Sequence, residues 1–218
     1  MSRSLVKKLI TDIIVGPAKK RFKAQSERKI VVLLDTIKTM EIHWQRAQEF
    51  QLKSYECFAN GVLFALVLQL DLTIMLFDQA SEFNEHRKNL YSRQLALLLY
   101  EGFEDLPSVF GKDFRAALLS LPSGKIFIHD LGLVIKRIAA LSTAHSRELK
   151  EIRRLVIAHR SHRAIEQLEL IRLLDQKELT RIASDLDMSL AELARVLTPA
   201  MMELGKPEIF LRQISNRS

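Results

Sequence analysis

Residues 30–44, IVVLLDTIKTMEIHW, place large apolar side chains at intervals of three and four. This spacing gathers them on one face of an α-helix and leaves polar side chains on the other. Neither Gly nor Pro occurs between residues 18 and 58. The sequence therefore predicts one long helix over this range, or two nearly continuous ones. The apolar positions are Ile30, Leu33, Leu34, Ile37, Met40 and Trp44.

The same helical pattern continues along the 218-residue chain, in which 48% of residues are hydrophobic and only seven are Gly and five Pro. This composition favours an all-α helical bundle with a substantial core. Gly61 is expected to mark a break in helical structure before an apolar helix. Ser142 or Thr143 is expected to interrupt a later helix. A capping box, Ser189 with Glu192, is expected to start the last helix. Further helices are predicted at about 61–78, 83–101, 112–120, from 126 or 130 onward, 164–186 and 189–204.

The positive charge lies at the N-terminus. Residues 1–30 hold nine Lys or Arg against two acidic residues, which equals the net charge of +7 for the whole chain. Residues 4–15 have an amphipathic spacing that Gly16-Pro17 ends. We therefore divide the chain into a basic amphipathic arm, 1–17, and one helical-bundle domain, 18–218. Such an arm suits nucleic acid, an anionic membrane surface or an acidic partner, or serves only solubility.

The cellular setting is inferred from three features. Cys57 is the only cysteine, so no disulfide forms within the chain and a reducing compartment is expected. The apolar run 61–77 contains Gln69 and Asp71, which favours a buried core helix over a membrane span. The apolar residues 9–15 are interrupted by Asp12, and no small-residue cleavage site follows. We expect a cytoplasmic protein without a membrane span.

The segment ELKEIRRLVIAHR, residues 148–160, combines arginines with a histidine after an aliphatic run. It resembles the Arg-x4–6-His motif of the HEPN superfamily, all-helical domains of prokaryotic toxins and antiphage effectors. Arg154-x4-His159 and Arg153-x5-His159 both satisfy the spacing. Residues 89–115 resemble a linking segment of abortive-infection members. An Arg stands at position 154, where the family usually has Asn after its motif arginine, so either Arg153 or Arg154 can be that arginine.

The resemblance implies a metal-independent endoribonuclease without a cofactor, acting as a homodimer with RNA as substrate. His159 would deprotonate the 2′-hydroxyl, and Arg153 or Arg154 would stabilise charge on the phosphoryl oxygens. Arg160, His162 and Arg163 are candidate RNA-binding residues. In a toxin or defence system, an antitoxin or a sensor protein is a plausible partner.

Helix geometry restricts this interpretation. At about 100° per residue, Arg154 lies about 140° and Arg153 about 120° around the helix from His159. A straight helix therefore cannot align them, and either the helix is distorted or two chains form a composite site. A solvated basic face with a core histidine, or an inactive HEPN-like scaffold that binds a protein or RNA, are the alternatives.

Other chemistry has weaker support. Neither an HExxH pattern nor a carboxylate cluster suggests a metal site. His86, Arg87 and Lys88 are better explained by a helix N-terminus than by a phosphate contact. Residues 179–197 faintly resemble a helix-turn-helix, but their second helix is too apolar and acidic to read DNA. Two packing helices are expected there.

Overall fold

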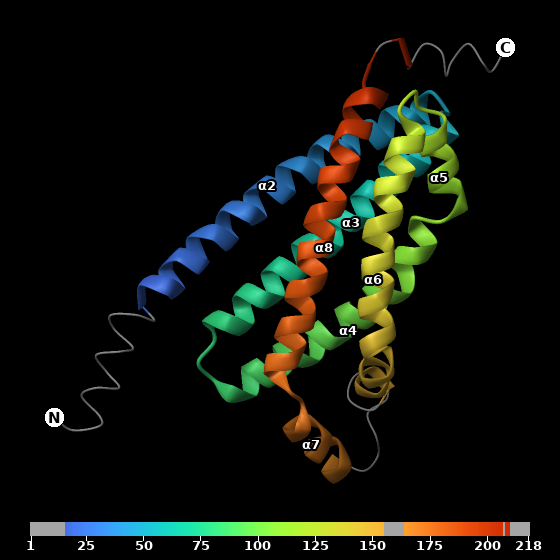
Figure 1. Ribbon diagram of the computed structural model, residues 1–218. Helices are drawn as coiled ribbons and strands as arrows, with labels where there is room; N and C mark the ends of the chain where they lie inside the picture. Colours follow the sequence, from blue (N-terminus) through green and yellow to red (C-terminus); the bar gives the residue numbers. More distant parts are fainter. Residues whose placement is uncertain (1–15, 155–163, 207, 210–218) are drawn as a thin grey trace.

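A computed structural model describes residues 16–154, 164–206 and 208–209 of the chain (Figure 1). These residues form seven α-helices and no strand, which confirms the all-α prediction. The helices are α2 (Gly16–Glu49), α3 (Lys53–Ser81), α4 (Glu85–Val109), α5 (Lys112–Leu119), α6 (Gly124–Ile152), α7 (Ala164–Leu173) and α8 (Gln176–Leu204).

The apolar helix α3 is the centre of the bundle. It contacts α2, α4, α5 and α8, while α6 packs against α4, α5 and α8 (Figure 1). Its inward positions include Phe58, Leu72 and Leu68, each at most 5% exposed. By length and composition alone α3 would suffice to cross a membrane. Many of its residues belong to the buried core of this fold.

Helices α2 and α3 form an antiparallel hairpin. The ring of Phe22 lies 6.4 Å from that of Phe77, and the ring of His43 lies 5.9 Å from that of Tyr55. The chain reverses at Phe50–Leu52, where Gln51 has a positive φ of 51°. The long helical pattern over 18–58 is thus two helices, the second of which begins at Lys53.

The break expected at Gly61 is wrong. Gly61 lies inside α3, and a Cβ there would be 2.6 Å from the ring of Phe114. The position is occupied by Gly because α5 packs closely against α3, and not because the helix ends. Ser142 and Thr143 likewise do not interrupt α6, and Thr143 donates its hydroxyl hydrogen to the carbonyl of Ala139.

The C-terminal helices also differ from the prediction. One helix ends at Leu173, and α8 then runs unbroken from Gln176 to Leu204, so residues 179–197 contain neither a helix-turn-helix nor two packing helices. Asp175 caps α8 by accepting from the backbone N–H groups of Lys177 and Glu178. Nothing in 176–198 breaks a helix, since Gly and Pro are absent there.

The expected capping box is therefore wrong as well. Ser189 is buried within α8 and donates to the carbonyl of Asp185. Glu192 forms an ion pair with Arg137 of α6 instead. Both residues serve helix packing in the middle of α8.

Candidate functional site

The candidate site lies where α6 ends. Leu149 and Ile152 are buried and hold this end of the helix against the core. Beyond Ile152 the backbone widens into a π-helical turn at Arg153 and Arg154. Such turns are rare and often occur at functional positions. The regular α-helix thus ends at Ile152, just before the two arginines.

Arg153 is held against the bundle. Its guanidinium carbon lies 5.0 Å from the centroid of the Tyr100 ring on α4. The side chain is half-buried, and its Nε is shielded from solvent without a hydrogen-bond partner in the described part of the chain. Arg153 therefore ties α6 to α4 through its contact with an aromatic face.

Arg154, in contrast, is exposed to solvent. Two adjacent arginines that the sequence could not distinguish thus have different surroundings. Of these two arginines, Arg154 is therefore the one more accessible to a dissolved phosphodiester.

The remaining motif residues lie outside the described residues. These are His159 and the three candidate RNA-binding residues Arg160, His162 and Arg163. Their assignment stays a prediction from the sequence.

A charged cluster that the sequence did not suggest lies two turns before the motif, between α6 and α8. Arg181 binds Glu178 at 2.6 Å and Asp185 at 2.9 Å. His145 of α6 lies 3.9 Å from the same Glu178 carboxylate and 3.4 Å from the Arg181 guanidinium. The hydrogen bond from Arg181 lowers the pKa of Glu178, so this carboxylate is ionised. The sequence contains the i, i+3 and i, i+4 spacing of these residues on α8, but it does not indicate that His145 of α6 lies beside them.

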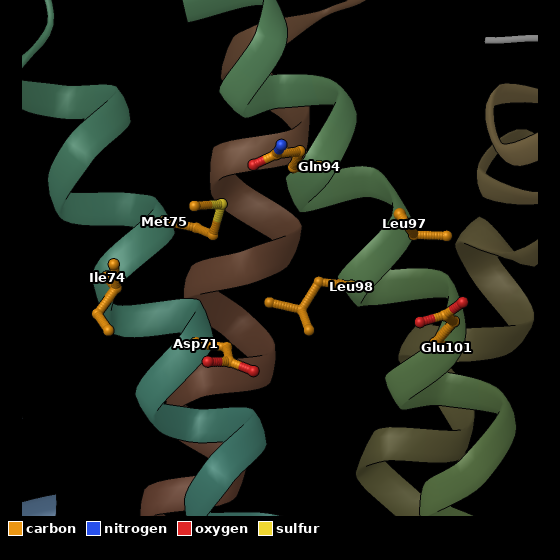
Figure 2. Close-up of a pocket in the computed structure, with 7 residues that line it drawn as sticks. All are labelled: Asp71, Ile74, Met75, Gln94, Leu97, Leu98 and Glu101. Carbon is orange, nitrogen blue, oxygen red and sulfur yellow. The ribbon is translucent and has the colours of Figure 1, made fainter. Parts of the chain in front are cut away.

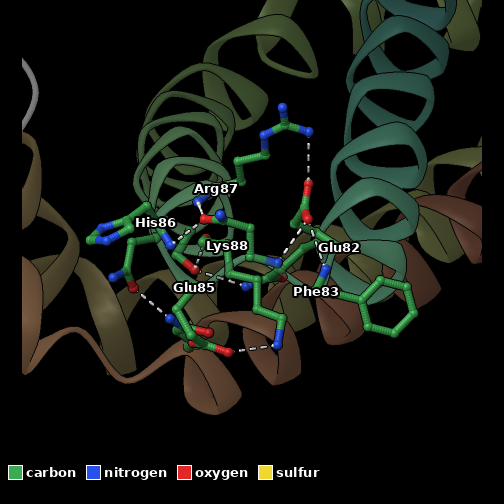
Figure 3. A network of polar contacts seen from close by, with 11 residues as sticks. Glu82, Phe83, Glu85, His86, Arg87 and Lys88 are labelled. Atoms are coloured by element: carbon green, nitrogen blue, oxygen red, sulfur yellow. Dashed lines mark hydrogen bonds and ion pairs between the residues drawn. The ribbon is translucent and has the colours of Figure 1, made fainter.

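The basic residues at 86–88 belong to a helix start (Figure 3). Asn84 accepts from the backbone N–H groups of His86 and Arg87 and so caps α4. Glu82 accepts from two backbone N–H groups, chiefly that of Asn84, and these bonds lower the pKa of its carboxyl group. Lys88 pairs with Glu85 at 2.9 Å. This arrangement agrees with the expected helix N-terminus.

The described residues contain no group of three or more His, Cys, Asp or Glu placed to hold a metal ion. Comparison of the chain with protein-family models, with curated proteins and with solved structures finds no match. The arrangement at the end of α6 and the sequence resemblance are therefore the basis on which a function can be proposed.

Proposed function

We propose that this protein is a metal-independent endoribonuclease of the HEPN type, with Arg154 and His159 as its catalytic pair. The observation that carries the proposal is that the two arginines at the π turn differ in burial and in contacts. Arg153 lies over the ring of Tyr100 and stabilises the end of α6. Arg154, five residues before His159 in the sequence, is exposed. Arg154-x4-His159 is then the motif pair.

The chemistry follows from these two side chains. His159 removes the proton from the ribose 2′-hydroxyl, and the 2′-oxygen forms a bond to phosphorus. The bond from phosphorus to the 5′-oxygen breaks, and the imidazolium returns the proton to that oxygen. Arg154 donates hydrogen bonds to the phosphoryl oxygens as their charge grows. The products are a 2′,3′-cyclic phosphate and a 5′-hydroxyl.

The proposed enzyme is a homodimer with a composite site. Helix α7, which follows the motif segment, exposes three aliphatic side chains, and Ile165 and Leu173 are 73% and 78% exposed. Leu168, 51% exposed, is the third. A two-fold interface through α7 would cover them and bring two motif segments together.

Cleavage of a labelled RNA in EDTA tests the proposal. We expect the wild type to remain active, and His159→Ala and Arg154→Ala to lose at least about 100-fold in rate. Arg147→Ala, an exposed arginine earlier on α6, is the matched control and should retain full activity. Cleavage that requires a metal, or that is equal in all variants, would contradict the assignment.

A folded wild type that binds RNA in a salt-dependent manner but cuts none of a panel would favour the non-catalytic scaffold instead. Product analysis adds a second criterion, because a 3′-hydroxyl end in place of a cyclic phosphate excludes attack by the 2′-oxygen.

A further inference from the structure

A pocket of about 340 Å³ opens on the outer side of the α3–α4 pair. Figure 2 shows its lining, with Ile74 and Met75 on α3, Leu97 and Leu98 on α4, and Met75 and Leu98 pointing toward each other. Gln94 lies toward one end of the pocket, and Asp71 and Glu101 lie toward the other. The positions used on α4 recur at intervals of three and four and therefore lie on one face of that helix.

The charge of this groove is negative. Its lining includes two carboxylates and no basic residue. Within the described residues, neither Asp71 nor Glu101 has an ion-pair partner. Partial burial raises the pKa of Asp71, and no neighbouring cation offsets this effect. The groove therefore suits an apolar surface edged with cations and repels RNA or an anionic bilayer.

The N-terminal arm has this chemistry. A helix over residues 4–15 would carry aliphatic side chains on one face, with Lys7 at one edge, Lys8 and Asp12 at the other, and Arg3 just before it. The apolar positions are Leu5, Val6, Leu9, Ile10, Ile13 and Ile14, and the lysines are Lys7 and Lys8. Residues 1–15 lie outside the described residues, and Gly16 is the first described residue.

The position of Gly16 sets what the arm can reach. Phe22 lies opposite Phe77, and His43 lies opposite Tyr55. Each pair of residue numbers adds to 98 or 99, so the same register places Gly16 level with Glu82, at the end of α3. A helix over residues 4–15 is about 18 Å long, and so is the part of α3 from Asp71 to Glu82.

Pro17 lies in the first turn of α2, where its missing N–H favours the start of a helix, and Gly16 before it permits a change of backbone direction. The Gly16-Pro17 pair therefore allows the chain to turn at this point. If it turns back along α3, Lys7 and Lys8 come level with about residue 74, next to the carboxylate end of the groove.

We propose that residues 4–15 fold back at Gly16-Pro17 as an amphipathic helix that occupies the α3–α4 groove of the same chain. Its aliphatic face covers Ile74, Met75, Leu97 and Leu98, and Lys7 and Lys8 pair with Asp71 and Glu101. The groove is then an intramolecular docking site for the basic arm, independent of the nuclease assignment.

Disulfide trapping in the full chain with Cys57→Ser tests directly whether residues 4–15 occupy the groove. Leu9→Cys is paired with Gln94→Cys at the groove, or with Lys136→Cys on the exposed face of α6 as the matched control. We expect rapid oxidation within one chain for the groove pair only. A covalent dimer would assign the groove to the arm of a second copy and overturn the proposal. So would equal rates for the two pairs.

Hydrogen exchange followed by mass spectrometry provides a second test. Amides of residues 4–15 should be protected in the wild type and should lose at least about tenfold in protection in Asp71→Lys/Glu101→Lys. Asp35→Lys/Glu41→Lys makes the same change of charge on the exposed side of α2 and should leave the protection intact. Fast exchange of the arm in the wild type would contradict docking.

Discussion

The guanidinium of Arg153 lies over the ring of Tyr100, 5.0 Å from its centroid, and so joins the end of α6 to the middle of α4. This contact holds Arg153, the residue before the exposed Arg154, at the end of α6. It also explains why Arg153 is half-buried although Arg154, its neighbour in the sequence, is exposed.

Substitutions of Tyr100 distinguish the contribution of its aromatic ring to stability from that of its hydroxyl group. Tyr100→Leu should destabilise the protein by about 1–2 kcal/mol, because the partly desolvated guanidinium loses its aromatic partner. Tyr100→Phe keeps a ring and should change stability by less than half of this. Urea denaturation measures both variants. Equal losses for Leu and Phe would show that the hydroxyl group, and not the ring, matters.

Replacing two exposed aliphatic residues of α7 tests the proposed dimer. Ile165→Asp/Leu173→Asp should convert the dimer to a monomer and abolish RNA cleavage, because charge would be buried at the two-fold interface. The mass in solution, from light scattering after size-exclusion chromatography, gives the result. Met202→Asp, at a residue 72% exposed near the end of α8, is the control and should leave the dimer intact. A dimer that survives in the α7 variant would place the interface elsewhere.

Removal of the Asp187 carboxylate should destabilise the protein, because this group holds α8 against α2 through Lys29. Lys29 lies 2.5 and 2.6 Å from the two oxygens of Asp187, and the buried amide of Gln69 donates to the same side chain at 3.3 Å. Asp187→Ala leaves both donors without this acceptor and should cost about 1–3 kcal/mol. Asp35→Ala breaks only the exposed pair with Lys38, at 3.9 Å, and should cost less than about 0.5 kcal/mol. Chemical denaturation measures the unfolding free energy of both variants. Similar losses would mean that the contacts of Asp187 add little to stability.

Two glycines inside helices should respond to alanine in opposite directions. Gly61→Ala places a methyl group 2.6 Å from the Phe114 ring and should destabilise the protein by about 1–3 kcal/mol. Gly132→Ala, with nothing within 4 Å of the new methyl group, should stabilise α6 by about 1 kcal/mol. Thermal and urea denaturation record both changes. A neutral Gly61→Ala would show that α5 can move away from α3.

The stability of the α2–α3 hairpin should fall in mild acid. Burial, and then the nearby Arg46, lower the pKa of His43 below its ordinary 6.5, and its Nδ1 is hydrogen-bonded to Tyr55. The folded state therefore favours the neutral imidazole, which contributes stability above pH 6.5 that is lost as the pH falls through the folded pKa. His43→Gln should reduce the loss of unfolding free energy between pH 7.5 and pH 5. An unchanged slope would exclude His43 as its source.

Helical periodicity predicted the class of fold because each helix encodes its own buried face. The pattern at Ile30–Trp44 marks α2, and the short helix expected at 112–120 matches α5 at Lys112–Leu119. Helix ends were predicted less well. Gly61 and Ser189 are typical of helix boundaries when seen in isolation, but both lie inside helices because neighbours pack against them or accept their hydrogen bonds.

The candidate site shows the same division. The sequence alone supplied the Arg-x4–6-His resemblance, the basic arm and the all-helical bundle, since composition and spacing are local properties of the chain. Only the tertiary structure separated Arg153 from Arg154, because the ring of Tyr100 is 53 positions away in the sequence and adjacent in space. It alone also formed the acidic groove, whose two sides come from different helices, and the cluster of His145 with Glu178 and Arg181. Such contacts depend on which helices become neighbours, and the pattern of a single helix does not encode that.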